Sequence, residues 1–248
     1  MKTRFSIATF IFLSMAGVGC GGLEVRSVWT SQQMTIDGAA AEWPDSAWTE
    51  KEGVRFGIMN DENNIYVVLE TPKQNLRRQI MIRGLTVWFD PLAREKQSIG
   101  IHYPIGGLGA GGRRMGEGDP RAGMTSALAE FEYISPLEQI PLRVSIVAGQ
   151  GVEVRVNNSQ ESLVYELKVP LQASSGHPYS IESRPGAKIS VGIEISGFER
   201  GGPSADAGAP TGGRGRRGST GADPRAGATT SMEPVSVWAA VHLAPAAR

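Results

Sequence analysis

Alternation of apolar and polar residues with period two recurs along most of the chain, and it is the pattern of strands that bury one face. Little helical periodicity lies between these runs, and turn residues separate them. Short strands at this spacing predict an all-β fold, an antiparallel β-sandwich of about nine or ten strands. The runs are Val54–Ile58, Ile65–Leu69, Leu85–Phe89, Ile99–Ile105, Leu142–Ile146, Val152–Val156, Tyr165–Val169, Ile189–Ile195 and Val235–Leu243, with Phe131–Tyr133 as a weaker one.

Three segments depart from the alternation. Pro72–Arg83 has Leu76 and Ile80 four residues apart and Gly84 after its end, which predicts one short helix. Two glycine-rich stretches, 106–128 and 201–233, are poor in apolar residues, so we expect two long mobile loops. Because a clean strand follows the second loop, the loops interrupt one domain, which we place at 29–245.

The N-terminus has the features of an export signal. Lys2 and Arg4 precede an apolar core that is too short to span a bilayer, and small residues then lead to Cys20, the chain's one cysteine. This arrangement resembles a bacterial lipoprotein signal. The resemblance implies a signal peptide at 1–19, a lipidated Cys20 carrying acyl chains such as palmitate, and a tether at 20–28. Gly21, directly after that cysteine, resembles the residue found there in lipoproteins that Gram-negative bacteria sort to the outer membrane. The alternative to a lipoprotein signal is an ordinary signal peptide, in which case Cys20 is a free thiol.

Composition and motifs argue against several functional classes. The chain has 25 Lys and Arg residues and 25 Asp and Glu residues, so its formal charge is zero. It lacks the excess of basic residues that is typical of a general nucleic-acid binder. Gly107, Gly109 and Gly112 match a dinucleotide fingerprint, but no helix follows them. No nucleophile elbow, zinc-protease or phosphate-loop motif occurs, and no pair of carboxylates stands out as a glycosidase pair. We therefore expect a protein that is not an enzyme and has no resident cofactor or metal.

The Asn60–Asn64 segment, with Asp61 at its second position, packs five oxygen-bearing side chains between two predicted strands. Such side chains could hold Ca²⁺, but Asn and Asp also favour tight turns because they bond their own backbone. We favour the hairpin turn.

Three stretches together resemble a known family: MTIDGAAAEWPDSAW from Met34, GIMNDENNIYVVLE from Gly57 and GLTVWFDP from Gly84. They are similar to the family 9 carbohydrate-binding domains and the related DOMON-like sandwiches. That resemblance implies a β-sandwich that binds sugar in some members and haem in others. Trp43 and Trp48 are expected to seal the base of the sandwich.

Strand parity gives candidate binding residues. When Leu85, Val87 and Phe89 point inward, the residues between them point outward, and a tryptophan there could stack against a sugar. The predicted ligand-binding residues are Thr86, Trp88, Asp90, Tyr66, Arg55 and His102; Trp238 and His242 also face outward.

Several alternatives stay open. Trp88 and Trp238 could instead form a second packing layer under loops. A haem would need axial ligands such as His102 or His242 with Met59 or Met81. A third alternative is an envelope structural or complex-assembly lipoprotein that contacts a protein partner and no small ligand. The favoured hypothesis is a lipid-anchored protein of the cell envelope that binds a carbohydrate.

Overall fold

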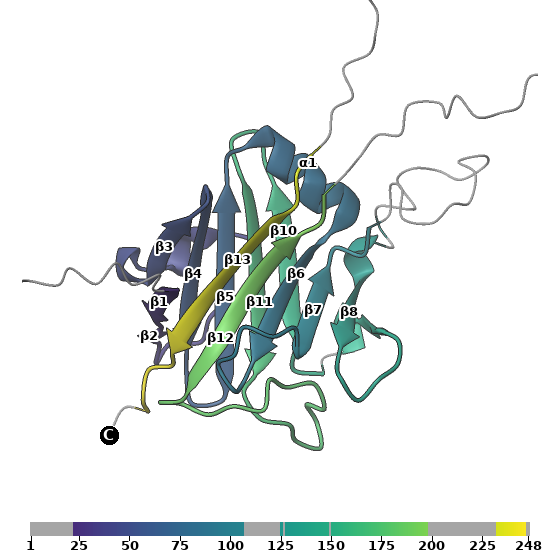
Figure 1. Cartoon of the computed structure of the whole chain (residues 1–248). Helices are drawn as coiled ribbons and strands as arrows, with labels where there is room; N and C mark the ends of the chain where they lie inside the picture. Colours follow the sequence, from purple (N-terminus) through teal and green to yellow (C-terminus); the bar gives the residue numbers. More distant parts are fainter. Residues whose placement is uncertain (1–21, 107–124, 126, 149, 198–231, 247–248) are drawn as a thin grey trace, which may run out of the picture.

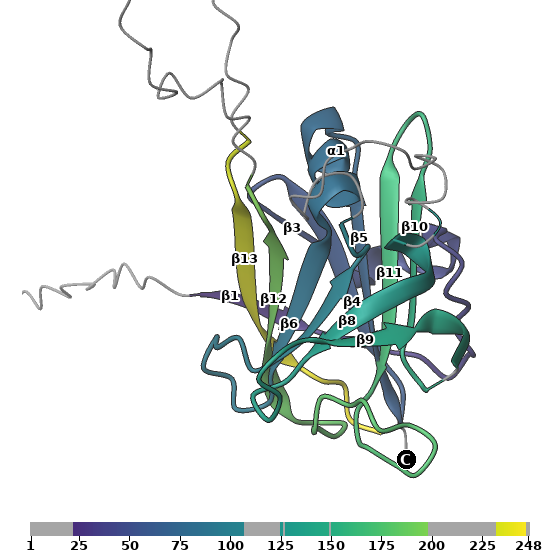
Figure 2. The ribbon, with the colours of Figure 1, turned by 90° about the vertical axis from the view of Figure 1, so that its right-hand side faces the viewer.

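The computed structural model describes residues 22–106, 125, 127–148, 150–197 and 232–246. Within them the chain forms two β-sheets packed face to face (Figures 1 and 2). The seven-stranded sheet has the order β1 (Leu23–Arg26), β13 (Val235–His242), β12 (Lys188–Ile195), β6 (Leu85–Asp90), β7 (Ile99–Tyr103), β8 (Glu130–Ile134) and β9 (Leu142–Ser145). The six-stranded sheet has the order β10 (Glu153–Asn158), β11 (Leu163–Pro170), β5 (Asn64–Thr71), β4 (Val54–Asn60) and β2 (Val28–Trp29), with β3 (Trp48–Lys51) also paired to β4.

The predicted all-β sandwich is confirmed, and each predicted run of alternation forms a strand. Two parallel pairs, β1 with β13 and β2 with β4, interrupt an otherwise antiparallel arrangement. The short strands β1, β2 and β3 escaped prediction because two to four residues are too few to show a period. The predicted tether at 20–28 is corrected accordingly, since Leu23–Arg26 and Val28 already belong to the two sheets.

The main core lies between the sheets and follows the alternation directly. Apolar residues at every second position of each strand are almost fully buried, and neighbours on adjacent strands share the same face. The largest fully buried side chains in this layer are Tyr103, Tyr165, Phe56, Phe89 and Phe131.

The predicted short helix is present as α1 (Gln74–Arg83) and lies across one end of the sandwich (Figure 1). Its Leu76 and Ile80 are buried against the core, as their spacing predicts. Arg77 donates from Nε to Asn158 Oδ1 at 3.0 Å, which joins the helix to the end of β10. Gly84 ends the helix with φ of 80°, a backbone conformation that favours glycine.

A second apolar cluster covers the outer face of the six-stranded sheet. The segment between β2 and β3 crosses that face and buries Met34, Ile36 and Trp43 against Met59 and Tyr66. Trp43 Nε1 donates to Glu166 Oε1 at 2.8 Å, so the indole is fixed at both its apolar and its polar atoms. Trp43 and Trp48 therefore form an outer layer, which corrects their expected place at the base of the sandwich.

The predicted signal peptide, Cys20 and most of the two glycine-rich stretches lie outside the described residues. In the part of the chain that the structure describes, no helix is both long and apolar enough to cross a membrane.

Candidate functional site

The outer face of the seven-stranded sheet is covered only in part among the described residues: in the loop after β6, Gln97 donates to Glu194 of β12, and Glu95 Oε1 would lie 3.2 Å from a Cβ built on Gly22, next to β1. Figure 2 shows β13, β12 and β6 at one side of the molecule, with the loop between β6 and β7 projecting on their outer side, whereas the segment before β3 lies against the opposite sheet. Polar and aromatic side chains at the outward positions of these strands are therefore candidates for ligand contact.

Two tryptophans and two glycines form a row across the middle of this face. Trp238 of β13 pairs with Gly192 of β12, Gly192 pairs with Trp88 of β6, and Trp88 pairs with Gly100 of β7. All four lie at outward positions, because their neighbours along each strand are buried in the core. The predicted outward position of Trp88 is thus confirmed, and that of Trp238 with it.

Each indole lies flat over a glycine of the next strand. A Cβ built on Gly100 would lie 2.7, 2.8 and 3.2 Å from Cζ3, Cε3 and Cη2 of Trp88. A Cβ on Gly192 would lie 2.7, 2.7 and 2.8 Å from Cε2, Cζ2 and Cη2 of Trp238. Three successive ring atoms at such similar distances mean that the face of the ring, not its edge, is turned to the strand. The opposite face of each ring is directed away from the sheet, and both side chains are partly exposed.

A row of polar side chains runs beside the tryptophans. It crosses the sheet through paired outward residues of six strands, from β13 to β9. Trp88 Nε1 and Gln97 Nε2 both donate to Glu194 Oε2, each at 2.8 Å, so this carboxylate borders the Trp88 ring. The residues of this polar row are Ser236, Glu194, Thr86, His102, Glu132 and Arg143.

Thr86 and His102 occupy the predicted face and bond each other, with Oγ1 and Nδ1 2.9 Å apart. Burial lowers the pKa of His102, and the nearby carboxylates Glu132 and Glu194 oppose this effect without overcoming it. The ring is therefore neutral at pH 7 and can both donate and accept a hydrogen bond. This suits recognition of a hydroxyl group better than recognition of an anion.

Asp90 lies on the same sheet but has a structural role. Its side chain is 0% exposed. The carboxylate accepts the backbone N–H groups of Leu92, Arg94 and Lys96 at 3.1, 2.8 and 3.2 Å, which fixes the loop after β6. A fully covered carboxylate cannot contact a ligand at the surface, so the expected binding role of Asp90 is corrected.

Arg55 and Tyr66 lie on the opposite side of the molecule, on the outer face of the six-stranded sheet. Tyr66 is 2% exposed within the second apolar cluster, and its hydroxyl donates to Asp61 Oδ2 at 2.6 Å. Arg55 stacks 3.8 Å from the centre of the Trp48 ring and pairs with Glu70. The six predicted residues therefore do not converge, because alternation predicts which side of a strand faces outward but not which sheet the strand joins.

The residues considered for haem are also scattered. Met59 belongs to the second apolar cluster and Met81 to α1. His102 and His242 share one face, but β7 and β13 are separated by β12 and β6. Since adjacent strands lie about 4.8 Å apart, the two rings are too distant to bind one iron from opposite sides.

The Asn60–Asn64 segment forms the hairpin turn favoured from the sequence. Asp61 Oδ1 accepts the backbone N–H groups of Asn63 and Asn64 at 2.7 and 2.6 Å, and its other oxygen accepts Tyr66. Both carboxylate oxygens thus hold the turn, as expected for an Asp that bonds its own backbone. Among the described residues, no three His, Cys, Asp or Glu side chains gather into a group that could hold a metal ion.

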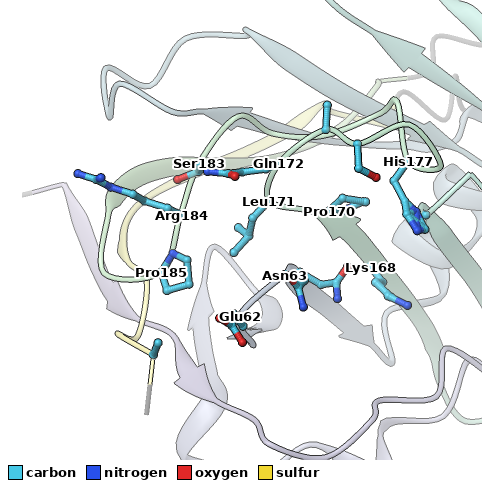
Figure 3. Close-up of a pocket in the computed structure, with 15 residues that line it drawn as sticks. Glu62, Asn63, Lys168, Pro170, Leu171, Gln172, His177, Ser183, Arg184 and Pro185 are labelled. Atoms are coloured by element: carbon cyan, nitrogen blue, oxygen red, sulfur yellow. The ribbon is translucent and has the colours of Figure 1, made fainter. Parts of the chain in front are cut away.

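A polar cleft of about 860 Å³ opens at one end of the sandwich, a feature that sequence reasoning missed (Figure 3). Glu62 and Asn63 come from the β4–β5 turn, Lys168 from β11, and His177 and Arg184 from the loop between β11 and β12. The described residues that line it include no Trp, Tyr or Phe. Lys168 Nζ donates to Glu153 Oε1 at 2.7 Å, so its charge is already paired.

Sequence reasoning also missed the two glycines beneath the tryptophans. Glycine inside a strand often marks a close approach of another group, and Gly100 and Gly192 each stand within an alternating run. A glycine inside a strand does not by itself show which side chain approaches it. The pairing of the strands must also be known.

Comparison with known proteins gives distant matches only. No family model matches the chain, and no curated protein matches it significantly. Among solved structures, the chain is similar to a family 9 carbohydrate-binding module from Caldicellulosiruptor kristjanssonii in complex with glucose, with 11% identity, a TM-score of 0.36, and coverage of 69% of this chain and 77% of that one. The same kind of module in complex with cellotriose gives 11% identity, a TM-score of 0.35, and coverage of 71% and 76%.

A protein from Bacteroides uniformis with a proposed carbohydrate-binding role matches at 10% identity and a TM-score of 0.35, covering 70% of this chain and 84% of that one. Two of these three structures are family 9 modules. At these values the matches say nothing about a ligand or a site, so any function must be inferred from the side chains of this chain.

Proposed function

We propose that the chain is a non-catalytic carbohydrate-binding protein whose ligand stacks on Trp88 and Trp238, the two-tryptophan surface of the seven-stranded sheet. One observation supports this most directly: both indoles lie flat on glycine at outward positions of the sheet, and both side chains are partly exposed. An open aromatic face matches the C–H surface of a pyranose ring, which is apolar, whereas its hydroxyl groups lie around the edge.

Hydrogen-bonding groups lie where those hydroxyls would be. Glu194 borders the Trp88 ring as an acceptor, Gln97 can donate, and the Thr86–His102 pair can do both. Such a surface is shallow, so stacking and a few hydrogen bonds would give affinities in the micromolar to millimolar range. No cofactor is needed for binding of this kind.

Retention of the purified domain on insoluble polysaccharides tests this proposal. We expect Trp88→Ala to abolish retention and Trp88→Phe to keep part of it, because phenylalanine preserves a ring at the same position. Trp48→Ala is the matched control: it removes a partly exposed indole from the opposite face. Equal retention of Trp88→Ala and the wild type on every polysaccharide that binds the wild type would contradict the proposal, as would a wild type that binds none.

The proposal also includes a location, the membrane of the cell envelope. If Cys20 is lipidated, only two residues separate it from Leu23, the first residue of β1, so the domain would lie against the membrane of the envelope. Acyl chains can hold a domain there without help from its charge, because each buried CH₂ contributes about 0.8 kcal/mol. Labelled palmitate should enter the wild type in a Gram-negative host and not Cys20→Ser; incorporation into both, or into neither, would contradict lipidation at this position.

A further inference from the structure

The loop between β6 and β7 lies beside the point where the described chain begins. Glu95 Oε1 would lie 3.2 Å from a Cβ built on Gly22, the residue before β1. Figure 2 shows this loop on the same side of the molecule as the beginning of β1. In the sequence only Gly21 stands between Gly22 and Cys20. Because an extended residue spans at most about 3.5 Å, a group attached to Cys20 enters the membrane within about 10 Å of this loop.

The loop holds an apolar side chain away from the protein. Leu92 is 64% exposed. It cannot turn inward freely, because the buried carboxylate of Asp90 accepts the backbone N–H groups of Leu92, Arg94 and Lys96 and so fixes the loop. A single exposed leucine is common on protein surfaces. This one differs because it stands on a fixed loop next to the attachment point of the chain.

The charges around Leu92 match a phospholipid surface. Arg94 and Lys96 are both exposed, and Glu95 between them is directed toward Gly22. Glu24, in β1, is already paired with two cations of its own sheet edge. At the interface of a bilayer an apolar side chain can enter the boundary of the acyl chains while basic groups bond the phosphates above it.

We propose that the β6–β7 loop is the membrane contact of the lipid-anchored protein, with Leu92 at the acyl boundary and Arg94 and Lys96 among the phospholipid headgroups. This inference rests on the location proposed above, lipidation of Cys20, and adds the orientation of the domain. One leucine and two cations cannot hold a domain on a membrane, but they can orient one that acyl chains already hold there. Because the loop projects outward from β13, β12 and β6, contact at its tip keeps the sheet itself off the bilayer (Figure 2).

Fluorescence quenching by lipids tests the inference on the full chain, lipidated in a Gram-negative host and reconstituted into vesicles of phosphatidylethanolamine and phosphatidylglycerol. Cys20 is the one cysteine in the sequence, and its acylated form does not react with a thiol label, so Leu92→Cys has a single labelling site. Leu137→Cys is the matched control: Leu137 is 86% exposed in the loop between β8 and β9, toward the edge of the sheet opposite β1. We expect nitroxide-bearing phospholipids to quench the fluorophore at 92 at least about twofold more than the same fluorophore at 137.

A second pair of variants tests the leucine itself. With the fluorophore at Ala93→Cys, the further change Leu92→Asp should reduce quenching at least about twofold, because a carboxylate does not enter the acyl boundary. Unchanged quenching in this pair, or equal quenching at 92 and 137, would overturn the inference while labelled palmitate on Cys20 leaves the location standing. A wild type without palmitate is a different result, which removes the location and the inference together. Far-UV circular dichroism and an unchanged unfolding midpoint identify variants that are folded.

Discussion

Both sheets of the sandwich present tryptophan on their outer faces, and the two faces use it differently. On the six-stranded sheet, Trp43 is 5% exposed and donates to Glu166 beneath the segment that precedes β3. On the seven-stranded sheet, Trp88 and Trp238 are partly exposed, and no strand or helix of the described chain lies over them. On one face the chain itself buries the indole, whereas on the other face two indoles stay partly exposed.

On both faces a glycine of a neighbouring strand makes room for the indole. Gly57 of β4 makes room for Trp43, since a Cβ at this position would lie 3.3 Å from Cε3 of the indole, just as Gly100 and Gly192 make room for Trp88 and Trp238. A tryptophan laid on a strand glycine is therefore not by itself a binding site. The two faces differ in how much of the ring stays exposed: Trp43 is buried, whereas Trp88 and Trp238 are partly exposed.

Removal of one indole from each face should show the largest difference. Trp43→Ala deletes a buried side chain and takes a donor from the buried Glu166, so we expect it to lower the free energy of unfolding by about 3–5 kcal/mol. Trp238→Ala removes a partly exposed ring, and we expect a loss of about 1 kcal/mol. Urea denaturation measures both; similar losses would mean that the two faces are equally structural.

Two fully buried carboxylates, one near each face, should respond to pH in opposite directions. Burial raises the pKa of Asp90, but its backbone hydrogen bonds and then Arg94 outweigh this and hold the pKa below 3.8. Its stabilisation is therefore present above pH 3.8 and is lost as the pH falls through the lower folded value. Burial raises the pKa of Glu166 above 4.5 despite its bonds to Trp43, Gly38 and Asp37. Its contribution is complete below pH 4.5 and is lost as the pH rises through the raised value.

Asp90→Asn tests the first half of this comparison. Asn keeps one acceptor oxygen but loses the second and the charge, so we expect a loss of about 1.5–3 kcal/mol at pH 7 that shrinks toward zero in acid. Glu166→Gln should remove the decline in stability that occurs as the pH rises through the raised pKa of Glu166. The free energy of unfolding of each variant as a function of pH gives both results, and a loss in Asp90→Asn that does not depend on pH would contradict the assignment.

The contrast between the faces also shows how far the sequence can predict this molecule. Alternation identified the long strands and the outward position of Trp88, because each depends only on parity within a strand. It could not place Tyr66 and Trp88 on opposite faces, since that depends on which strands pair. It also missed the cover over Tyr66, because the segment that contains Met34, Ile36 and Trp43 has no regular period.

The site itself depends on contacts between distant segments. The row of Trp238, Gly192, Trp88 and Gly100 joins residues up to 150 positions apart, as the sequence numbers of Trp88 and Trp238 show. Nothing local indicates that Glu194 borders the indole of Trp88, whereas the bonds from the backbone after β6 to Asp90 are a local turn pattern that strand parity does not consider. Parity therefore predicted the outward positions of both tryptophans, and strand order determined their neighbours.

Alanine in place of the supporting glycines should distinguish the faces more finely. At Gly57 the new Cβ would meet Val68 Cγ1 at 3.0 Å and the Ala47 carbonyl at 3.2 Å, neither of which can move away in a packed interior. We expect Gly57→Ala to cost about 1–3 kcal/mol. At Gly100 the Cβ would meet only the Trp88 ring within 3.2 Å, and this ring can lift into solvent, so the stability loss should be smaller although binding to polysaccharide weakens.

Urea denaturation together with polysaccharide retention checks this pair of variants. Gly57→Ala should lose stability and retain binding once folded, and Gly100→Ala should do the reverse. A Gly100→Ala protein that binds as well as the wild type would show that the flat position of the Trp88 ring is unnecessary for the proposed ligand.

The smallest effect is expected at the edge of the open face, where β1 pairs with β13. Glu24 accepts Lys188 Nζ at 2.8 Å and His242 Nε2 at 3.1 Å, and the bond from Lys188 followed by that from His242 lowers its pKa from 4.5 to about 2. The pairing therefore stabilises β1 above pH 4.5 and is lost as the pH falls through about 2. Because these side chains are exposed, solvent screens them, and we expect Glu24→Gln to leave global stability almost unchanged.

Hydrogen exchange in Glu24→Gln should nevertheless become faster at residues 23–26 and stay the same at Val191 in the centre of the sheet, since an edge strand opens locally without unfolding the core. Equal exchange at β1 in both proteins would mean that the backbone pairing with β13 alone holds this edge, and faster exchange throughout the sheet would mean that β1 belongs to the cooperative core that supports both faces.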